Sequence, residues 1–149
     1  MKIENKILEI LDCTLMGNET IEVTNCIIDS FEMNFTTYQY PVEIYNCIIG
    51  NFLVHSTWFT KGLKLINCII KENIHYEMGG HNVMTIIMEG NIFMDFFNFF
   101  DCQFDNKVIV RNNVFVKGSN LLSKEGYKST FNLGIEVNAN YGTLDINEF

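Results

Sequence analysis

The sequence predicts an all-β solenoid, in which short parallel strands stack into about six or seven coils of roughly 21 to 23 residues. The first observation behind this prediction is a repeat. The motif Asn-Cys-Ile-Ile occupies residues 25–28, 46–49 and 67–70, so it returns every 21 residues. The second observation is the spacing of apolar residues, which recur five positions apart, whereas a helix places them three and four apart. A repeat of this length is typical of chains that stack like units.

The residue pattern of the two most regular coils explains why short strands are predicted. In each coil a central apolar residue recurs every five positions, and a second series lies two positions ahead of it. Pairs of apolar residues two apart, separated by corners, suit short strands whose paired side chains point into a common core. The central series is Val23, Ile28, Met33 and Tyr38, then Ile44, Ile49, Val54 and Phe59. The second series is Ile21, Cys26, Phe31 and Thr36, then Val42, Cys47, Phe52 and Thr57.

The remaining chain follows the same plan less regularly, as one domain over residues 1–149. A loop is expected at 78–82 and a long turn at 117–128, because both place Gly among polar residues. The rod is roughly 30 Å long at about 4.8 Å per stacked strand. We expect a short first coil at about 7–20, regular coils at about 21–84, less regular coils at about 85–134, and a cap or last coil at 135–149.

Three inward pairs resemble the pattern of the pentapeptide-repeat proteins, in which a small residue, often Ala or Cys, precedes a central Leu or Phe by two positions. Over residues 8–115 the chain is also similar to small right-handed parallel β-helices, and the resemblance implies that fold. The pairs are Cys26/Ile28, Cys47/Ile49 and Cys68/Ile70. The chain departs from the family pattern between the paired residues, where Asp or Asn is usual and Ile27, Ile48 and Ile69 stand instead. No functional residue carries over.

Composition limits the classes of function. Apolar residues make up 48% of the chain, and the single proline, Pro41, falls at an expected corner, where no ladder N–H is needed. The charged residues 1–6 and the lack of about 20 consecutive apolar residues predict a cytoplasmic protein without a membrane span. The formal charge of −8 disfavours direct binding to nucleic acid or an anionic membrane.

The cysteines indicate core thiols. Stacked strands lie about 4.8 Å apart, farther than the roughly 3.8 Å between the Cβ atoms of a disulfide. Buried free Cys behaves as a small apolar residue. Cys102 lies outside the repeat and is expected to be exposed. One interior file of free thiols is therefore predicted from Cys13, Cys26, Cys47 and Cys68.

Asparagines precede these cysteines and predict a structural ladder at one corner, because Asn tolerates left-handed backbone and its amide can bond within a stack. Replacing Asn46 with Leu should therefore lower stability. The ladder comprises Asn25, Asn46 and Asn67, with Asp12 before them and Asn112 or Asn113 after them.

The sequence contains little evidence for a metal site or a catalytic site, and no cofactor is expected. His55 and His75 could lie on adjacent strands near Glu77, a set that can bind metal, but two polar residues on an outer face is the favoured interpretation. Arg111 and the acids Asp95, Asp101 and Asp105 could serve a carbohydrate-active enzyme, in which paired carboxylates act on a glycosidic bond. The favoured interpretation is that Asp95 and Asp101 are solvated turn residues, and the chain is much shorter than such enzymes. The sequence therefore predicts no catalytic, cofactor or metal residues.

An aromatic run offers a possible interface. Alternation places one set of its rings in the core and leaves the other either exposed or covered by the 117–128 turn. Exposed aromatic patches usually mark interfaces. The residues concerned are Phe96, Phe97, Phe99, Phe100 and Phe104.

Three functions remain as hypotheses. The first is a non-enzymatic structural or protein-interaction module, which forms homo-oligomers or binds a protein partner through a side face or an exposed coil end. The second is a carbohydrate-binding or degenerate carbohydrate-active β-helix, with sugar stacking on Trp58, Tyr38 and Tyr40. The third is an acidic rod that binds a DNA-handling protein, as do some acidic pentapeptide-repeat proteins that the chain resembles in charge and rod shape.

Overall fold

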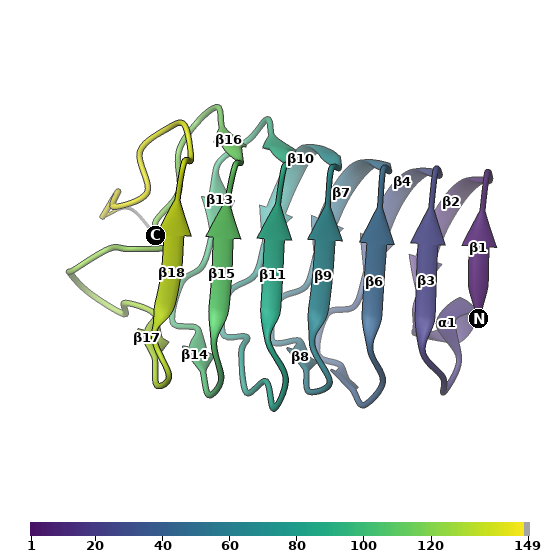
Figure 1. Cartoon of the computed structure of the whole chain (residues 1–149), viewed down its shortest axis with the longest axis horizontal. Helices are drawn as coiled ribbons and strands as arrows, with labels where there is room; N and C mark the ends of the chain where they lie inside the picture. The colour runs from purple at the N-terminus through teal and green to yellow at the C-terminus, as the bar shows by residue number, and fades with distance from the viewer. Residues whose placement is uncertain (148–149) are drawn as a thin grey trace.

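The computed structural model, which describes residues 1–147, shows parallel strands stacked into a right-handed β-solenoid (Figure 1). In Figure 1 the chain runs up each strand of the near sheet and returns behind it before reaching the next strand to the left. Every strand pairing is parallel, because each strand meets its equivalent in the next coil. The predicted all-β fold class is confirmed.

Two sheets form the main sides of the solenoid. The first has seven strands in the order β1 (Lys2–Glu4), β3 (Ile21–Thr24), β6 (Val42–Tyr45), β9 (Leu63–Ile66), β11 (Ile86–Glu89), β15 (Val108–Arg111) and β18 (Ile135–Asn138). The second has β2 (Ile7–Asp12), β4 (Ile27–Glu32), β7 (Ile48–Leu53), β10 (Ile69–His75), β12 (Ile92–Phe93) and β16 (Val114–Phe115), with β13 (Phe97–Asn98) also paired to β10.

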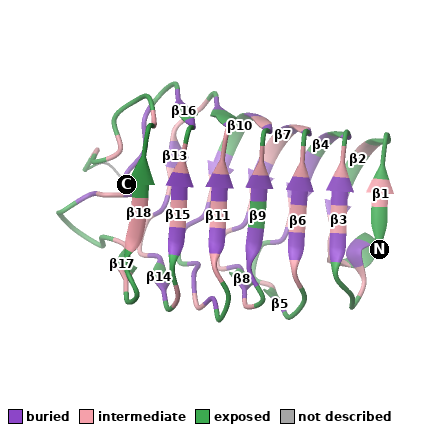
Figure 2. Cartoon of the chain, viewed as in Figure 1, coloured by how far each residue is buried: buried purple, intermediate pink, exposed green. Residues whose placement is uncertain are grey.

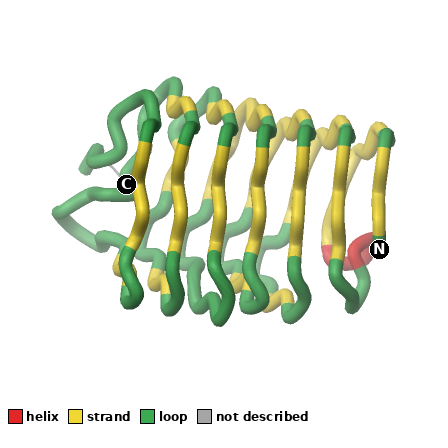
Figure 3. The backbone as a smooth tube through the Cα atoms, in the orientation of Figure 1, coloured by secondary structure: helices red, strands yellow, loops and turns green. Residues whose placement is uncertain are grey.

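The third side is mostly loop, drawn green in Figure 3. Its short strands pair in two groups, and a single helix, α1 (Cys13–Met16), follows β2 in the first coil. The pairs are β5 (Thr37–Tyr38) with β8 (Trp58–Phe59), and β14 (Gln103–Phe104) with β17 (Thr130–Phe131).

The chain makes about five turns, slightly fewer than the six or seven expected. The first coil is incomplete because α1 replaces its third-side strand, and within residues 1–147 no second-sheet strand follows β18. Coil length grows along the rod. Equivalent residues lie 21 apart between Cys26 and Cys47, but 27 apart between Asn113 and Asn140. The additional residues form the projecting loop between β16 and β17, where the long turn was predicted.

The core lies between the sheets, and the two predicted inward series fill it (Figure 2). Of the sixteen residues in those series, only Thr36 is not buried. Aromatic rings stack from coil to coil, as in Phe31 with Phe52, whose centroids lie 5.4 Å apart. Burying such rings, together with the aliphatic side chains of the core, stabilises the stacking of successive coils.

Within residues 1–147, no helix is long and apolar enough to cross a membrane.

Candidate functional site

One corner of the solenoid is built from residues with left-handed backbone. Each lies between the first and second sheets. In every coil before the last, its N–H donates to a carbonyl of the next coil, as from Asn46 to Ile66 at 3.0 Å. Left-handed backbone favours Gly and Asn, which explains the recurrent Asn. The side chains of Asn25, Asn46 and Asn67 form no hydrogen bond with one another. The corner residues, with φ between 54° and 70°, are Asn5, Asn25, Asn46, Asn67, Gly90, Asn112 and Ala139.

The position that follows this corner holds a file of polar side chains, buried except at Asn140, which is half-buried. In each coil the side chain accepts a hydrogen bond from the backbone N–H of the equivalent residue one coil earlier. Cys47 Sγ accepts from the Cys26 N–H at 3.4 Å, and Asn113 Oδ1 accepts from the Asn91 N–H at 2.9 Å. The file, which we call the inner file, runs through Cys26, Cys47, Cys68, Asn91, Asn113 and Asn140.

The cysteine thiols and the asparagine amides of the inner file make equivalent hydrogen bonds to the backbone of neighbouring coils. Asn91 Nδ2 donates to the Leu65 carbonyl at 2.8 Å, and Cys68 Sγ lies 3.8 Å from the equivalent Ile44 carbonyl. A hydrogen bond with Cys47, together with burial, raises the pKa of Cys68 above its ordinary value. Each file member thus satisfies backbone groups that would otherwise be buried without partners. The predicted ladder of bonded amides at Asn25, Asn46 and Asn67 is wrong. Amides bond to one another one position later, at Asn91, Asn113 and Asn140, of which the prediction named only Asn113.

Three further predictions about these files are wrong. Cys13 lies in α1, half-buried against Met33 and Thr36, because the first coil pairs Ile7 with Ile27 and so sets the exposed Lys6, not a cysteine, at the position equivalent to Cys26. For the same reason Asn5 takes the corner, while Asp12 caps α1. Cys102 is fully buried, and its thiol donates to the Tyr76 carbonyl.

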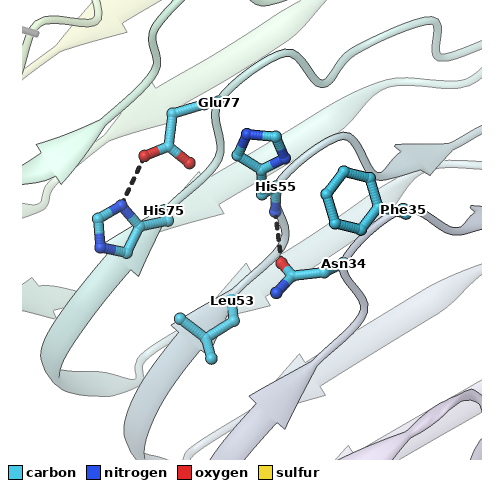
Figure 4. A pocket seen from close by; sticks show the side chains of 6 residues that line it. All are labelled: Asn34, Phe35, Leu53, His55, His75 and Glu77. Atoms are coloured by element: carbon cyan, nitrogen blue, oxygen red, sulfur yellow. Dashed lines mark hydrogen bonds and ion pairs between the residues drawn. The ribbon is translucent and has the colours of Figure 1, made fainter.

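An open pocket of about 370 Å³ lies where three successive coils leave the second sheet (Figure 4). His75 Nδ1 lies 2.5 Å from Glu77 Oε1, which also accepts from Asn98 Nδ2 at 2.9 Å. Glu77 is nearly buried, and its Oε2 has no hydrogen-bond partner among the described residues. Such a carboxylate fixes the orientation of an imidazole. The lining residues are Asn34, Phe35, Leu53, His55, His75 and Glu77.

The two histidines share this pocket but not a ladder position. The strand register sets His75 opposite Leu53, after an irregularity between Glu72 and Ile74. His55 Nδ1 lies 3.0 Å from the Ser56 hydroxyl, and its ring packs against Phe35 at 5.1 Å. Within residues 1–147, no three His, Cys, Asp or Glu side chains are placed to hold a metal ion.

The suggested acidic cluster is dispersed. Arg111 ends a strand of the first sheet and pairs with Glu89, where Nε and Oε1 are 2.9 Å apart. Asp95 follows the second sheet, and the Phe96 backbone N–H holds the pKa of this carboxyl below its usual value. Asp105, after β14, contacts His81 at 3.2 Å. The solenoid therefore gives these groups separate structural partners.

The aromatic run belongs mainly to the core. Phe97, Phe99 and Phe104 are buried and cannot form an outer interface, because alternation turns them inward. Phe96 is half-buried, and Phe100 packs on Tyr127 of the projecting loop, with ring centroids 5.3 Å apart.

The proposed sugar-stacking residues are also divided. Tyr38 is only 4% exposed, and its hydroxyl donates to the Glu19 carbonyl, so its assignment as an outer ring is wrong. Its position is the inward one of β5. Trp58 is 40% exposed on the third side, with its ring 4.5 Å from that of His81. Tyr40 is also exposed, and its ring packs against that of Tyr38 at 5.9 Å.

A continuous apolar stripe runs along the outside of the second sheet, and sequence reasoning did not identify it. Its members occupy one outward position in successive coils and are hydrogen-bonded neighbours in the ladder. The signal was present in the first isoleucine of the Asn-Cys-Ile-Ile repeat, which stands where the pentapeptide pattern usually has Asp or Asn. We call this surface the outer stripe; it consists of Ile7, Ile27, Ile48, Ile69, Ile92, Val114 and Tyr141.

The comparisons with known proteins add no relative. No protein-family model matches the chain, and no curated protein or solved structure does. The likeness to pentapeptide-repeat proteins therefore remains a resemblance in the inward pairs, and the chain is placed by its fold, as a parallel β-solenoid.

Proposed function

We propose that this solenoid is a non-enzymatic structural or protein-interaction module that self-associates through the outer stripe. The observation that carries the proposal is the length of the stripe, which spans every coil from Ile7 to Tyr141 without a polar residue. Its ends are the most exposed, with Ile7 80% and Tyr141 77% accessible. Contiguous apolar surface of this kind usually marks an interaction site.

The chemistry of the stripe suits a protein partner. β-Branched side chains on a strand are stiff at χ1, so little side-chain entropy is lost when they are covered. The stacked backbone holds them at fixed spacing, which provides a rigid, shape-defined surface. Acidic and basic side chains stand beside the stripe, so an apolar centre has a polar rim.

Sedimentation velocity over a wide protein concentration range tests the proposal. The wild-type chain should associate as concentration rises, and Ile48→Lys, in the middle of the stripe, should remove that association. Ile109→Lys is the matched control, because Ile109 is similarly half-exposed on the outer face of the first sheet. A wild-type chain that stays monomeric throughout, or equal losses in the two variants with unchanged circular dichroism, would refute the proposal.

Carbohydrate binding is a second candidate, favoured by the pocket beside Phe35. This ring is 78% exposed next to His55, and Asn34 and Glu77 supply polar groups for hydroxyls. Calorimetric titration with neutral and acidic oligosaccharides tests it. Binding that is lost in Phe35→Ala would locate sugar in the pocket, whereas loss in Trp58→Ala would locate it on the third side. The acidic-rod alternative depends on the net charge of −8 alone.

A further inference from the structure

We infer that the partner on the outer stripe is a second copy of this chain, lying antiparallel to the first, with Ile69 at the two-fold axis. The inference depends on the proposed function, since it specifies how the stripe is covered. Two-fold dimers use the same patch on both copies, so the patch must be complementary to itself.

The stripe has the symmetry that such a dimer requires. Ile69 is the fourth of its seven members, with three on each side. A two-fold axis that crosses the stripe at Ile69 sets Ile48 against Ile92 of the other copy, and Ile27 against Val114. Every apolar residue then meets another apolar residue. Because the axis closes the assembly, the product is a dimer and not a fibre.

Charge beside the stripe favours the antiparallel arrangement. The outward position two residues after the stripe holds, from the first coil onward, Glu9, Asp29, Gly50, Lys71, Met94 and Val116, and Lys117 follows the last of these. Glu9, Asp29 and Lys71 are all exposed. A parallel dimer would bring two acidic ends together, and like charges at an interface are destabilising. An antiparallel dimer instead separates the two acidic ends, and each then faces the half of the other copy that holds Met94, Val116 and Lys117.

The area of the face predicts a reversible dimer. Seven stacked residues at about 4.8 Å per step span about 29 Å, and a six-residue strand such as β4 spans about 20 Å. The flat area is then about 580 Å² per copy, or about 1,200 Å² for the pair, which is the lower limit of specific interfaces. Association should therefore depend on concentration in the micromolar range, where sedimentation can follow it.

Cross-linking through introduced cysteines tests the arrangement in the full chain. Ile69→Cys alone should give a covalent dimer with a short bismaleimide, because the two copies meet at this residue. Ile27→Cys alone and Val114→Cys alone should not, but an equal mixture of the two should cross-link. Ile109→Cys, on the first sheet, controls for random collision. Wild-type protein reports any contribution from native thiols, of which all but Cys13 are buried.

The outcomes separate the inference from the proposed function. Self-cross-linking of Ile27→Cys and of Val114→Cys would show a parallel dimer and overturn the inference while leaving the stripe as the interface. An absence of cross-links in all stripe variants would also overturn only the inference, provided that sedimentation shows a wild-type dimer which Ile48→Lys removes. A monomeric wild-type chain would overturn both. Cross-linking of Ile109→Cys at the rate of Ile69→Cys would equally refute the arrangement.

Discussion

Replacement of Asn113 by Leu should strongly destabilise the solenoid, although it exchanges a polar core residue for an apolar one of similar branched shape. Asn113 is buried, and its amide is fully used. Its Oδ1 accepts from the backbone N–H and the Nδ2 of Asn91, while its Nδ2 donates to the Met88 carbonyl and to Asn140 Oδ1. Leu can replace none of these bonds, and the Asn91 N–H lies where water does not reach.

The expected cost follows from those lost partners. A buried donor or acceptor left without a partner costs about 1–3 kcal/mol, so two such groups cost about 2–6 kcal/mol. Burial of the additional apolar atoms offsets about 1–2 kcal/mol of this. The net loss of about 1–4 kcal/mol is a large share of the roughly 5–15 kcal/mol by which domains are stable.

Urea unfolding followed by circular dichroism measures the loss. Asn113→Cys is the informative control, because a thiol accepts the equivalent N–H in Cys47 and Cys68. The free energy of unfolding of Asn113→Cys should therefore stay close to that of the wild-type protein, whereas that of Asn113→Leu falls. Cys68→Asn should be tolerated for the same reason. The reasoning is refuted if Asn113→Leu costs under about 1 kcal/mol, or if Asn113→Cys costs as much as Leu.

Three further predictions concern the corner, the thiols and acid stability. Asn46→Leu should lower stability by about 1–2 kcal/mol because Asn46 has left-handed backbone, whereas Asn46→Gly should retain it, as Gly90 does at the equivalent corner; equal urea midpoints would contradict this. When the thiols of the folded protein are titrated, only Cys13 should react rapidly, because the other cysteines are buried and burial raises the pKa of Cys102 to about 12. A rapid phase that persists in Cys13→Ser would contradict this prediction. The interactions that lower the pKa of Asp95 stabilise the folded chain. This stabilisation is fully present at pH values above the unfolded pKa of about 3.9, and it is lost as the pH falls through the lower pKa of the folded state. Asp95→Asn should therefore reduce the acid dependence of Tm, and an unchanged dependence would count against that carboxyl.

The repeat itself made much of the fold predictable. Residues five apart, each with a partner two positions ahead, identified the inward side chains of the regular coils, such as Val23 and Phe59, which are buried. This succeeded because strand alternation is local: whether a side chain faces the core depends on its neighbours in the chain. The predicted corner at Asn46 succeeded for the same reason, since left-handed backbone is a property of one residue.

The site was less predictable, because its features depend on register between coils. Cys13 and Cys102 were placed by their distance from other cysteines, but coil length varies, and stacking decides which residue enters a file. The isoleucines that continue the Asn-Cys motif were visible in the sequence as a departure from a family pattern. The continuation of this row of apolar side chains through Ile92 to Tyr141 was not visible in the sequence, because the later coils lack the Asn-Cys motif.

The sequence by itself determined that this chain stacks short strands and which side chains of the regular coils point inward, because both follow from periods of two, five and 21 residues. Only the tertiary structure decided that thiols and amides share one buried file and that seven apolar side chains align outside it. The physical reason is that hydrogen bonds between coils, rather than distances along the chain, set which residues become neighbours.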